Sequence, residues 1–211
     1  MFSCLRDERR GHKALWLGRR LLFVAACVVA LAAPDCARAP AERILVRNEF
    51  TASAEGWRIS GDTKMTEPVF SLTGGHPGGC ITGIDEALGE TWFFRAPPEI
   101  VKLLPSAVNG AISYSLKQSG PWMSLIDDDV VILGRAGRLS YRFPNPPGMD
   151  WTEFAVRLSE EAGWTWNWNK RATQAQIASV LGSPFALQIR GEFVTGDDQG
   201  SLDNFVLTAA P

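Results

Sequence analysis

The sequence predicts an all-β fold, a two-sheet antiparallel sandwich with one short helix. Short apolar or alternating runs recur throughout residues 42–211. Gly, Pro, Asn and Asp separate these runs, and repeated short strands with turn residues between them are typical of β sandwiches. Only the segment 173–182 combines helical apolar spacing with both end signals. Roughly ten strands fit one sandwich of this size.

Composition places the chain among globular proteins. It has 211 residues, of which 45% are apolar and 21% charged, with a net charge of −2. Residues 1–41 hold seven of the 21 Lys and Arg but only three of the 23 Asp and Glu, so the remainder carries a net −6. An acidic body argues against nucleic acid or an anionic membrane as partner. We expect a monomer.

The first 41 residues are predicted to be a signal peptide. A basic segment precedes the apolar run Leu21 to Ala33, and Ala39-Pro40-Ala41 offers the small residues of a cleavage site. Cleavage there leaves Glu42 as the new N-terminus and 42–211 as one domain, secreted or periplasmic. An uncleaved N-terminal anchor is the alternative, although about 20 apolar residues are needed to span a bilayer.

Cysteine usage fits this division of the chain. The leader holds Cys4, Cys27 and Cys36, so Cys80 is left alone and no intramolecular disulfide can form after cleavage. Cys80 lies in a strand-like setting, which favours a buried, unreactive thiol. The two histidines are His12 and His76, too few for a histidine-based metal site.

Strands are expected wherever apolar residues alternate or cluster between turns. Residues 111–116, 139–143 and 154–158 alternate, while 91–94 form an aromatic strand that ends before two prolines. Residues 74–79 read as a Gly/Pro-rich loop. The other expected strands are 45–46, 56–59, 80–84, 130–133, 185–190 and 205–207.

One helix is predicted over residues 173–182. Thr173 and Gln176 have the spacing of a capping box, in which each side chain accepts the other's backbone N–H. Ile177, Val180 and Leu181 share one face, and Gly182 supplies the stop. A helical turn is also compatible with residues 100–104.

The order of several short motifs resembles a known family. These motifs are 50–57, His76-Pro77-Gly78-Gly79-Cys80-Ile81, Phe93-Phe94-Arg95-Ala96-Pro97, 111–114, 130–141, 172–181, 189–193 and Leu202-Asp203-Asn204-Phe205. Together they resemble the laminin B (laminin IV type A) domain in its bacterial form, over roughly 155 residues.

The resemblance implies a galactose-binding-like jelly roll with extracellular adhesion or matrix roles and no catalytic residues. Similar jelly rolls often hold a structural calcium ion where the first and last strands meet. Asp203 and Glu55, with Asn48 nearby, are the candidate ligands implied here. The alternative for Asp203 is a side chain that accepts backbone N–H groups at a strand entry. No other cofactor is expected.

Tryptophans are the candidate ligand-binding residues. In an extended segment, Trp164, Trp166 and Trp168 share one face, which suits a pyranose ring, and Asn167 can bond hydroxyl groups. Because tryptophan is mostly buried, packing of at least two of these rings in the core is favoured over a sugar platform. Trp122 lies in a Gly-Pro turn and is a candidate exposed contact.

These observations predict a secreted, non-catalytic module that recognises a glycan or an extracellular surface protein. The alternatives are a secreted glycan-active hydrolase and a purely structural surface component. A hydrolase needs two carboxylates placed across the sugar, and Asp85 and Glu192 are the pair to test. Nothing in their sequence surroundings indicates a raised pKa.

Overall fold

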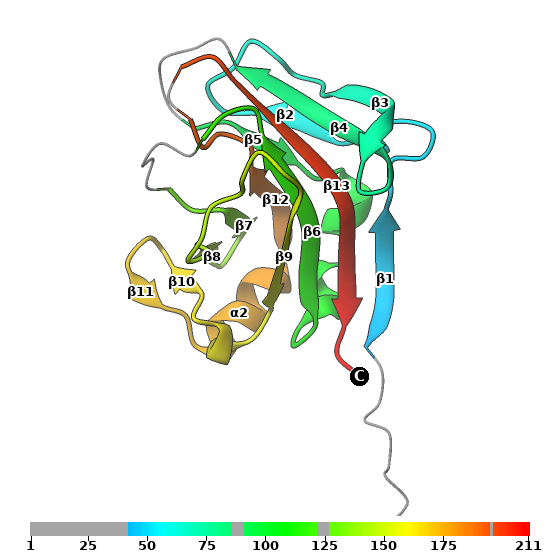
Figure 1. Ribbon diagram of the computed structural model, residues 1–211. Helices are drawn as coiled ribbons and strands as arrows, with labels where there is room; N and C mark the ends of the chain where they lie inside the picture. The colour runs from blue at the N-terminus through cyan, green and yellow to red at the C-terminus, as the bar shows by residue number, and fades with distance from the viewer. Residues whose placement is uncertain (1–41, 86–90, 122–126, 195) are drawn as a thin grey trace, which may run out of the picture. The chain divides into compact units, whose positions relative to one another are not determined.

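The computed structural model describes residues 42–85, 91–121, 127–194 and 196–211. Its strands form two antiparallel sheets (Figure 1), which confirms the predicted fold class. The predicted signal peptide and Trp122 lie outside these residues, so cleavage after Ala41 and the role of Trp122 stay predictions. Within the described ranges, no helix is long and apolar enough to cross a membrane.

The first sheet has the order β3-β4-β13-β6-β9, and β1 also pairs with β13. Its longest strand, β13, pairs with β4 through residues 198–202 and with β1 through residues 205–209, while β6 follows its other edge (Figure 1). The strand bounds are β1 (Arg43–Asn48), β3 (Val69–Gly75), β4 (Gly78–Asp85), β6 (Ala111–Gln118), β9 (Thr152–Arg157) and β13 (Asp198–Ala209).

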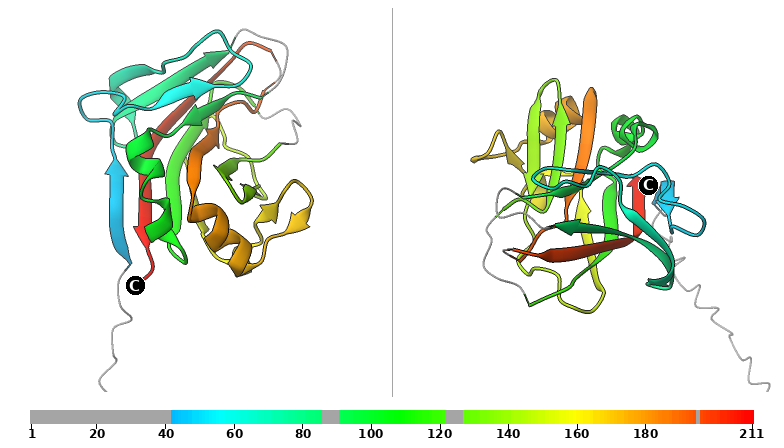
Figure 2. Two further views of the ribbon diagram at one scale, coloured as in Figure 1. Left: turned by 180° about the vertical axis from the view of Figure 1, so that it is seen from behind. Right: turned by 90° about the horizontal axis from the view of Figure 1, so that it is seen from above.

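The second sheet has the order β11-β10-β8-β7-β12-β5-β2 and faces the first across the core (Figure 2). Every strand expected from alternation or apolar clustering is present in one of the two sheets. The bounds are β2 (Arg58–Ser60), β5 (Phe93–Arg95), β7 (Val130–Gly134), β8 (Gly137–Tyr141), β10 (Thr165–Trp166), β11 (Lys170–Arg171) and β12 (Pro184–Arg190).

The predicted helix is α2 (Gln174–Leu181), and its capping box is confirmed. The Thr173 hydroxyl accepts the Gln176 N–H at 3.3 Å, and Gln176 Oε1 accepts the Thr173 N–H at 2.9 Å. The helix packs on β7 and β8. The predicted single helix is not the whole helical content. The structure also has the one-turn helix α1 (Pro98–Val101) and the 3-10 turns η1 (Leu104–Ala107) and η2 (Glu160–Ala162).

Large aromatic side chains fill the space between the sheets. Trp57, Trp92 and Trp164 are each at most 1% exposed. The Trp92 ring needs glycine beside it, because a Cβ at Gly83 or Gly191 would lie 2.4 or 2.0 Å from ring atoms. Such close approaches fix the ring's position in the core. Cys80 is a buried free thiol, as predicted.

Candidate functional site

The outer face of the first sheet carries a groove. Alternation on β6 sends Ile112, Tyr114 and Leu116 into the core, so the neighbouring Ser113 and Ser115 face outward. Register places Ser113 between Val206 of β13 and Ala155 of β9. The groove has a volume of about 800 Å³, and its lining also includes Ile44, Arg47, His76, Glu153, Asn204 and Thr208.

A β-bulge in β13 positions His76 at the edge of this groove. The register between β13 and β6 shifts between Asp203 and Val206, and Asn204 takes a left-handed φ of 52°. Buried Asp203 Oδ2 accepts the His76 N–H at 2.6 Å, and Asn204 Nδ2 donates to the His76 carbonyl oxygen. Bulges re-aim side chains in this way next to binding sites.

Trp151, just before β9, stacks on His76. The ring centroids lie 6.2 Å apart with planes 5° from parallel. Trp151 Nε1 donates to the Gly74 carbonyl oxygen at 3.2 Å, as does Lys117 Nζ, which also lies 4.8 Å from the indole centroid. The half-buried Trp151 ring is therefore held by a hydrogen bond, a stacked ring and a cation.

The cluster of His76, Trp151 and Lys117 joins two hollows. His76 lines the larger groove, whereas Lys117 lines a smaller one of about 310 Å³ with Ser119, Met149 and Ser201. Both hollows lie on the outer face of the same sheet. A flat aromatic pair between two polar-lined hollows can hold an extended chain of rings with hydroxyl groups.

His76 does not form a Ser–His–Asp relay. Its Nδ1 lies 3.4 Å from Ser115 Oγ, but Asp203 accepts the backbone N–H of His76 and not a ring N–H. In a catalytic triad the carboxylate bonds the imidazole, which orients the ring and stabilises its charged form. The geometry therefore suits recognition better than acyl transfer.

The tryptophan run 164–168 is not one extended strand. Asn167 and Trp168 have left-handed φ values of 46° and 74°, so the chain turns after Trp166 and the three rings do not form one row. Trp164 is fully buried and Trp166 packs against the core, which matches the alternative of core packing, whereas Trp168 is 74% exposed. Asn167 Oδ1 accepts the Arg138 N–H and so stabilises the turn.

The residues implied for calcium are engaged with the protein itself. Asn48 Oδ1 accepts the Trp57 indole N–H at 3.0 Å, and Asn48 Nδ2 donates to Glu55. Both Asp203 carboxylate oxygens accept backbone N–H groups. The Asn48 side-chain oxygen thus already accepts a hydrogen bond, whereas calcium requires several converging oxygens. Calcium binding at Asp203 and Glu55 stays a prediction.

Asp85 and Glu192 meet in a buried acidic cluster with Asp198. Burial, together with the neighbouring carboxylates, raises the pKa of Glu192 to about 7 and that of Asp198 to about 6. For Glu192, the expectation of no raised pKa was therefore wrong. Glu192 and Asp85 are 4% and 1% exposed. The core residue Trp92 donates its backbone N–H to Glu192 at 3.3 Å and its indole N–H to Asp198 at 3.1 Å.

Sequence reasoning did not identify Trp151, Lys117 or the outer face of the first sheet. His76 was noted only as part of a loop. The available signal was the alternation of β6, which separates its serines from its core residues. The pairing of β6 with β13 and β9, which turns these positions into a groove, is a long-range property.

The sequence of the chain matches a known protein family. The sequence model of Laminin B (Domain IV) matches residues 93–211, from β5 to the C-terminus. The chain belongs to this family. The resemblance found in the sequence is confirmed, and the match includes Lys117, Trp151 and the β13 bulge, while His76 precedes it. Comparison with curated proteins finds no match.

Solved structures share the fold of this laminin B domain. The L4b domain of human laminin alpha-2 superposes with a TM-score of 0.61 at 14% identity, over 79% of this chain and 99% of that one. A family 11 carbohydrate-binding module of the Clostridium thermocellum cellulase Lic26A-Cel5E gives 0.51 at 11% identity, over 82% and 97%. The Clostridium thermocellum module in complex with a β-1,3-1,4-mixed-linked tetrasaccharide gives 0.51 at 12%, over 82% and 98%.

Proposed function

We propose that this laminin B domain is an exported, non-catalytic module that binds a glycan chain across the outer face of its first sheet. The observation that carries the proposal is the stacked pair of His76 and Trp151 between two hollows. An aromatic face packs well on the apolar face of a pyranose ring, and nearby polar groups fix its orientation. Ser113 and Glu153 are groove residues suited to bond hydroxyl groups.

The fold of the domain also supports the proposed glycan binding. A carbohydrate-binding module of the same fold is known in complex with a tetrasaccharide. Because the identity is 12%, that likeness concerns the architecture alone, and the choice of glycan rests with the side chains of this chain.

A glycan-active hydrolase is the second candidate, favoured by the raised pKa of Glu192. The burial of Glu192 and Asp85 argues against a hydrolase, because a catalytic carboxylate must reach the glycosidic oxygen or the attacking water. Glu192 and Asp85 contact the core in place of solvent. The third candidate is a purely structural surface or matrix component. Such a component would bind no ligand at the groove.

One experiment separates these candidates. The purified protein is applied to a glycan array, and each glycan that binds is incubated with the protein and analysed for shortened products. We expect binding without product release, with the strongest signals from extended chains. Release of sugar indicates a hydrolase, and an array without signal contradicts glycan recognition.

A further inference from the structure

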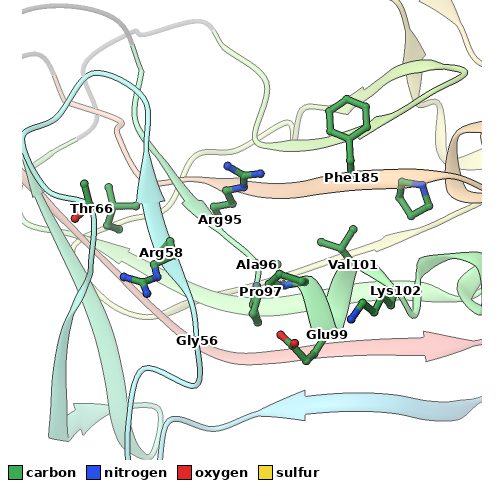
Figure 3. Close-up of a pocket in the computed structure, with 13 residues that line it drawn as sticks. Gly56, Arg58, Thr66, Arg95, Ala96, Pro97, Glu99, Val101, Lys102 and Phe185 are labelled. Atoms are coloured by element: carbon green, nitrogen blue, oxygen red, sulfur yellow. The ribbon is translucent and has the colours of Figure 1, made fainter.

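A third hollow, of about 740 Å³, lies on the outer side of the seven-stranded sheet. Strands β2 and β5, helix α1 and the start of β12 surround it (Figure 3). Ile59 and Phe94 are buried members of β2 and β5, so alternation turns Arg58 and Arg95 outward. No residue of this hollow belongs to the groove described above.

Three cationic side chains from different elements line this hollow. Register places Arg58 directly opposite Arg95, and Lys102 follows α1. Like charges at directly opposed strand positions are destabilising. Glu67 forms an ion pair with Arg58, but among the described residues no hydrogen bond or ion pair engages the side chain of Arg95 or Lys102. Among the described residues that line the hollow, Glu99 is the only carboxylate.

The hollow also has an apolar wall. The register of β12 with β7 shifts between Pro184 and Ala186, and Phe185 at this irregularity is 56% exposed. Figure 3 shows Phe185 and Arg95 on the same side of the hollow, with Pro97 between β5 and α1. An exposed aromatic ring beside unpaired cations suits a ring-shaped ligand that carries an anion.

We infer that this hollow is a second binding site, which takes the carboxylate of an acidic saccharide such as a uronate. The Arg95 guanidinium offers two parallel N–H donors to the carboxylate, Lys102 adds a positive charge, and Phe185 packs on the sugar ring. Residues 42–211 carry a net negative charge, so this cationic hollow differs from the rest of the domain. The inference extends the proposed glycan recognition to a separate site.

The test is a calorimetric titration of the purified protein with oligogalacturonate, a neutral oligosaccharide of equal length and inorganic sulfate. We expect oligogalacturonate to bind more tightly than the other two and to weaken as salt is raised. Arg95→Gln should weaken it at least about tenfold, because a bidentate charged contact is lost. Arg135→Gln is the matched control, since Arg135 is an exposed arginine in the β7–β8 turn.

The outcomes separate this inference from the proposed function. Trp151→Ala should leave oligogalacturonate binding at the hollow unchanged. The inference is overturned if oligogalacturonate does not bind, or binds with the same affinity as inorganic sulfate or the neutral sugar. Neither result bears on the glycan binding proposed for the groove of the first sheet. Equal loss in Arg95→Gln and Arg135→Gln also overturns it, because the effect is then one of net charge. Thermal unfolding of both variants verifies that each is folded.

Discussion

The imidazole of His76 lies parallel to the indole of Trp151, with centroids 6.2 Å apart. The two residues come from the β3–β4 turn and from the segment before β9, which are at opposite edges of the same sheet order. Asp203 and Asn204 of the β13 bulge hold the turn at this position through hydrogen bonds to the His76 backbone. The candidate site therefore depends on an irregularity in the longest strand.

Replacing Trp151 by Ala should remove glycan binding with little effect on folding. An aromatic residue at the centre of a binding surface typically contributes about 2 kcal/mol or more, which is over tenfold in affinity. Trp168→Ala is the control, because Trp168 is exposed and lies in the turn between β10 and β11 of the other sheet. Titration of both variants with the glycan selected on the array gives the comparison. Equal affinities would remove Trp151 from the site.

Replacing Asp203 by Asn should lower both stability and binding. Asp203 is fully buried and accepts the backbone N–H groups of His76 and Asn204. An amide can accept only at one atom, so one buried N–H loses its partner at a cost of about 1–3 kcal/mol. Urea unfolding measures the first effect. Melting in calcium and in chelator, for wild type and variant, also tests Asp203 as a metal ligand.

Trp92→Ala should destabilise the domain by about 3–5 kcal/mol, as expected for a large ring lost from a packed core. The variant also leaves Asp198 without the indole N–H that donates to it at 3.1 Å. Trp57→Ala should behave similarly, since it leaves Asn48 Oδ1 unpaired. Denaturant unfolding measures both. A loss below about 1 kcal/mol, typical of surface positions, would contradict their place in the core.

Stability should fall as pH rises from about 5 to about 8. The folded-state pKa values of Glu192 and Asp198, about 7 and about 6, lie above the values of the unfolded chain, so the folded state binds more protons in this range. The two carboxyl groups contribute to the free energy of unfolding in full when pH is below their pKa values in the unfolded chain. This contribution is lost as pH rises through their pKa values in the folded protein. Arg190 and Asp85 face the same cluster and modify the size of the effect.

Thermal unfolding across this pH range measures the dependence. Glu192→Gln should flatten the curve, because the amide does not titrate, whereas the exposed control Asp150→Asn should follow the wild type. A melting temperature that rises between pH 5 and 8, or a Glu192→Gln curve parallel to the wild type, would contradict the assignment.

The fold could be predicted because local signals agreed. Alternation on β6, β8 and β9, the capping box of α2 and the isolated Cys80 each matched the structure. Strand β3 was missed, since Val69–Gly75 shows no apolar alternation and its Leu72 is 67% exposed. Pairing with β4 makes this segment a strand.

The candidate site could not be predicted to the same extent. Three tryptophans at alternate positions, Trp164, Trp166 and Trp168, predicted a shared face. The left-handed backbone at Asn167 and Trp168 turns the chain, so the three rings do not point the same way. His76, Lys117 and Trp151 are distant in sequence and meet only through strand pairing. The raised pKa of Glu192 likewise arises from burial beside Asp198 and Asp85, which come from other segments.

The most direct test follows the indole N–H signals of the tryptophans by two-dimensional ¹H–¹⁵N NMR while the selected glycan is added. Trp151 is predicted to shift saturably, and the buried Trp57, Trp92 and Trp164 to stay in place. Assignment by single Trp→Phe variants identifies each signal. A shift confined to Trp168 or Trp122, with Trp151 unmoved at saturation, would contradict glycan binding on the outer face of the first sheet.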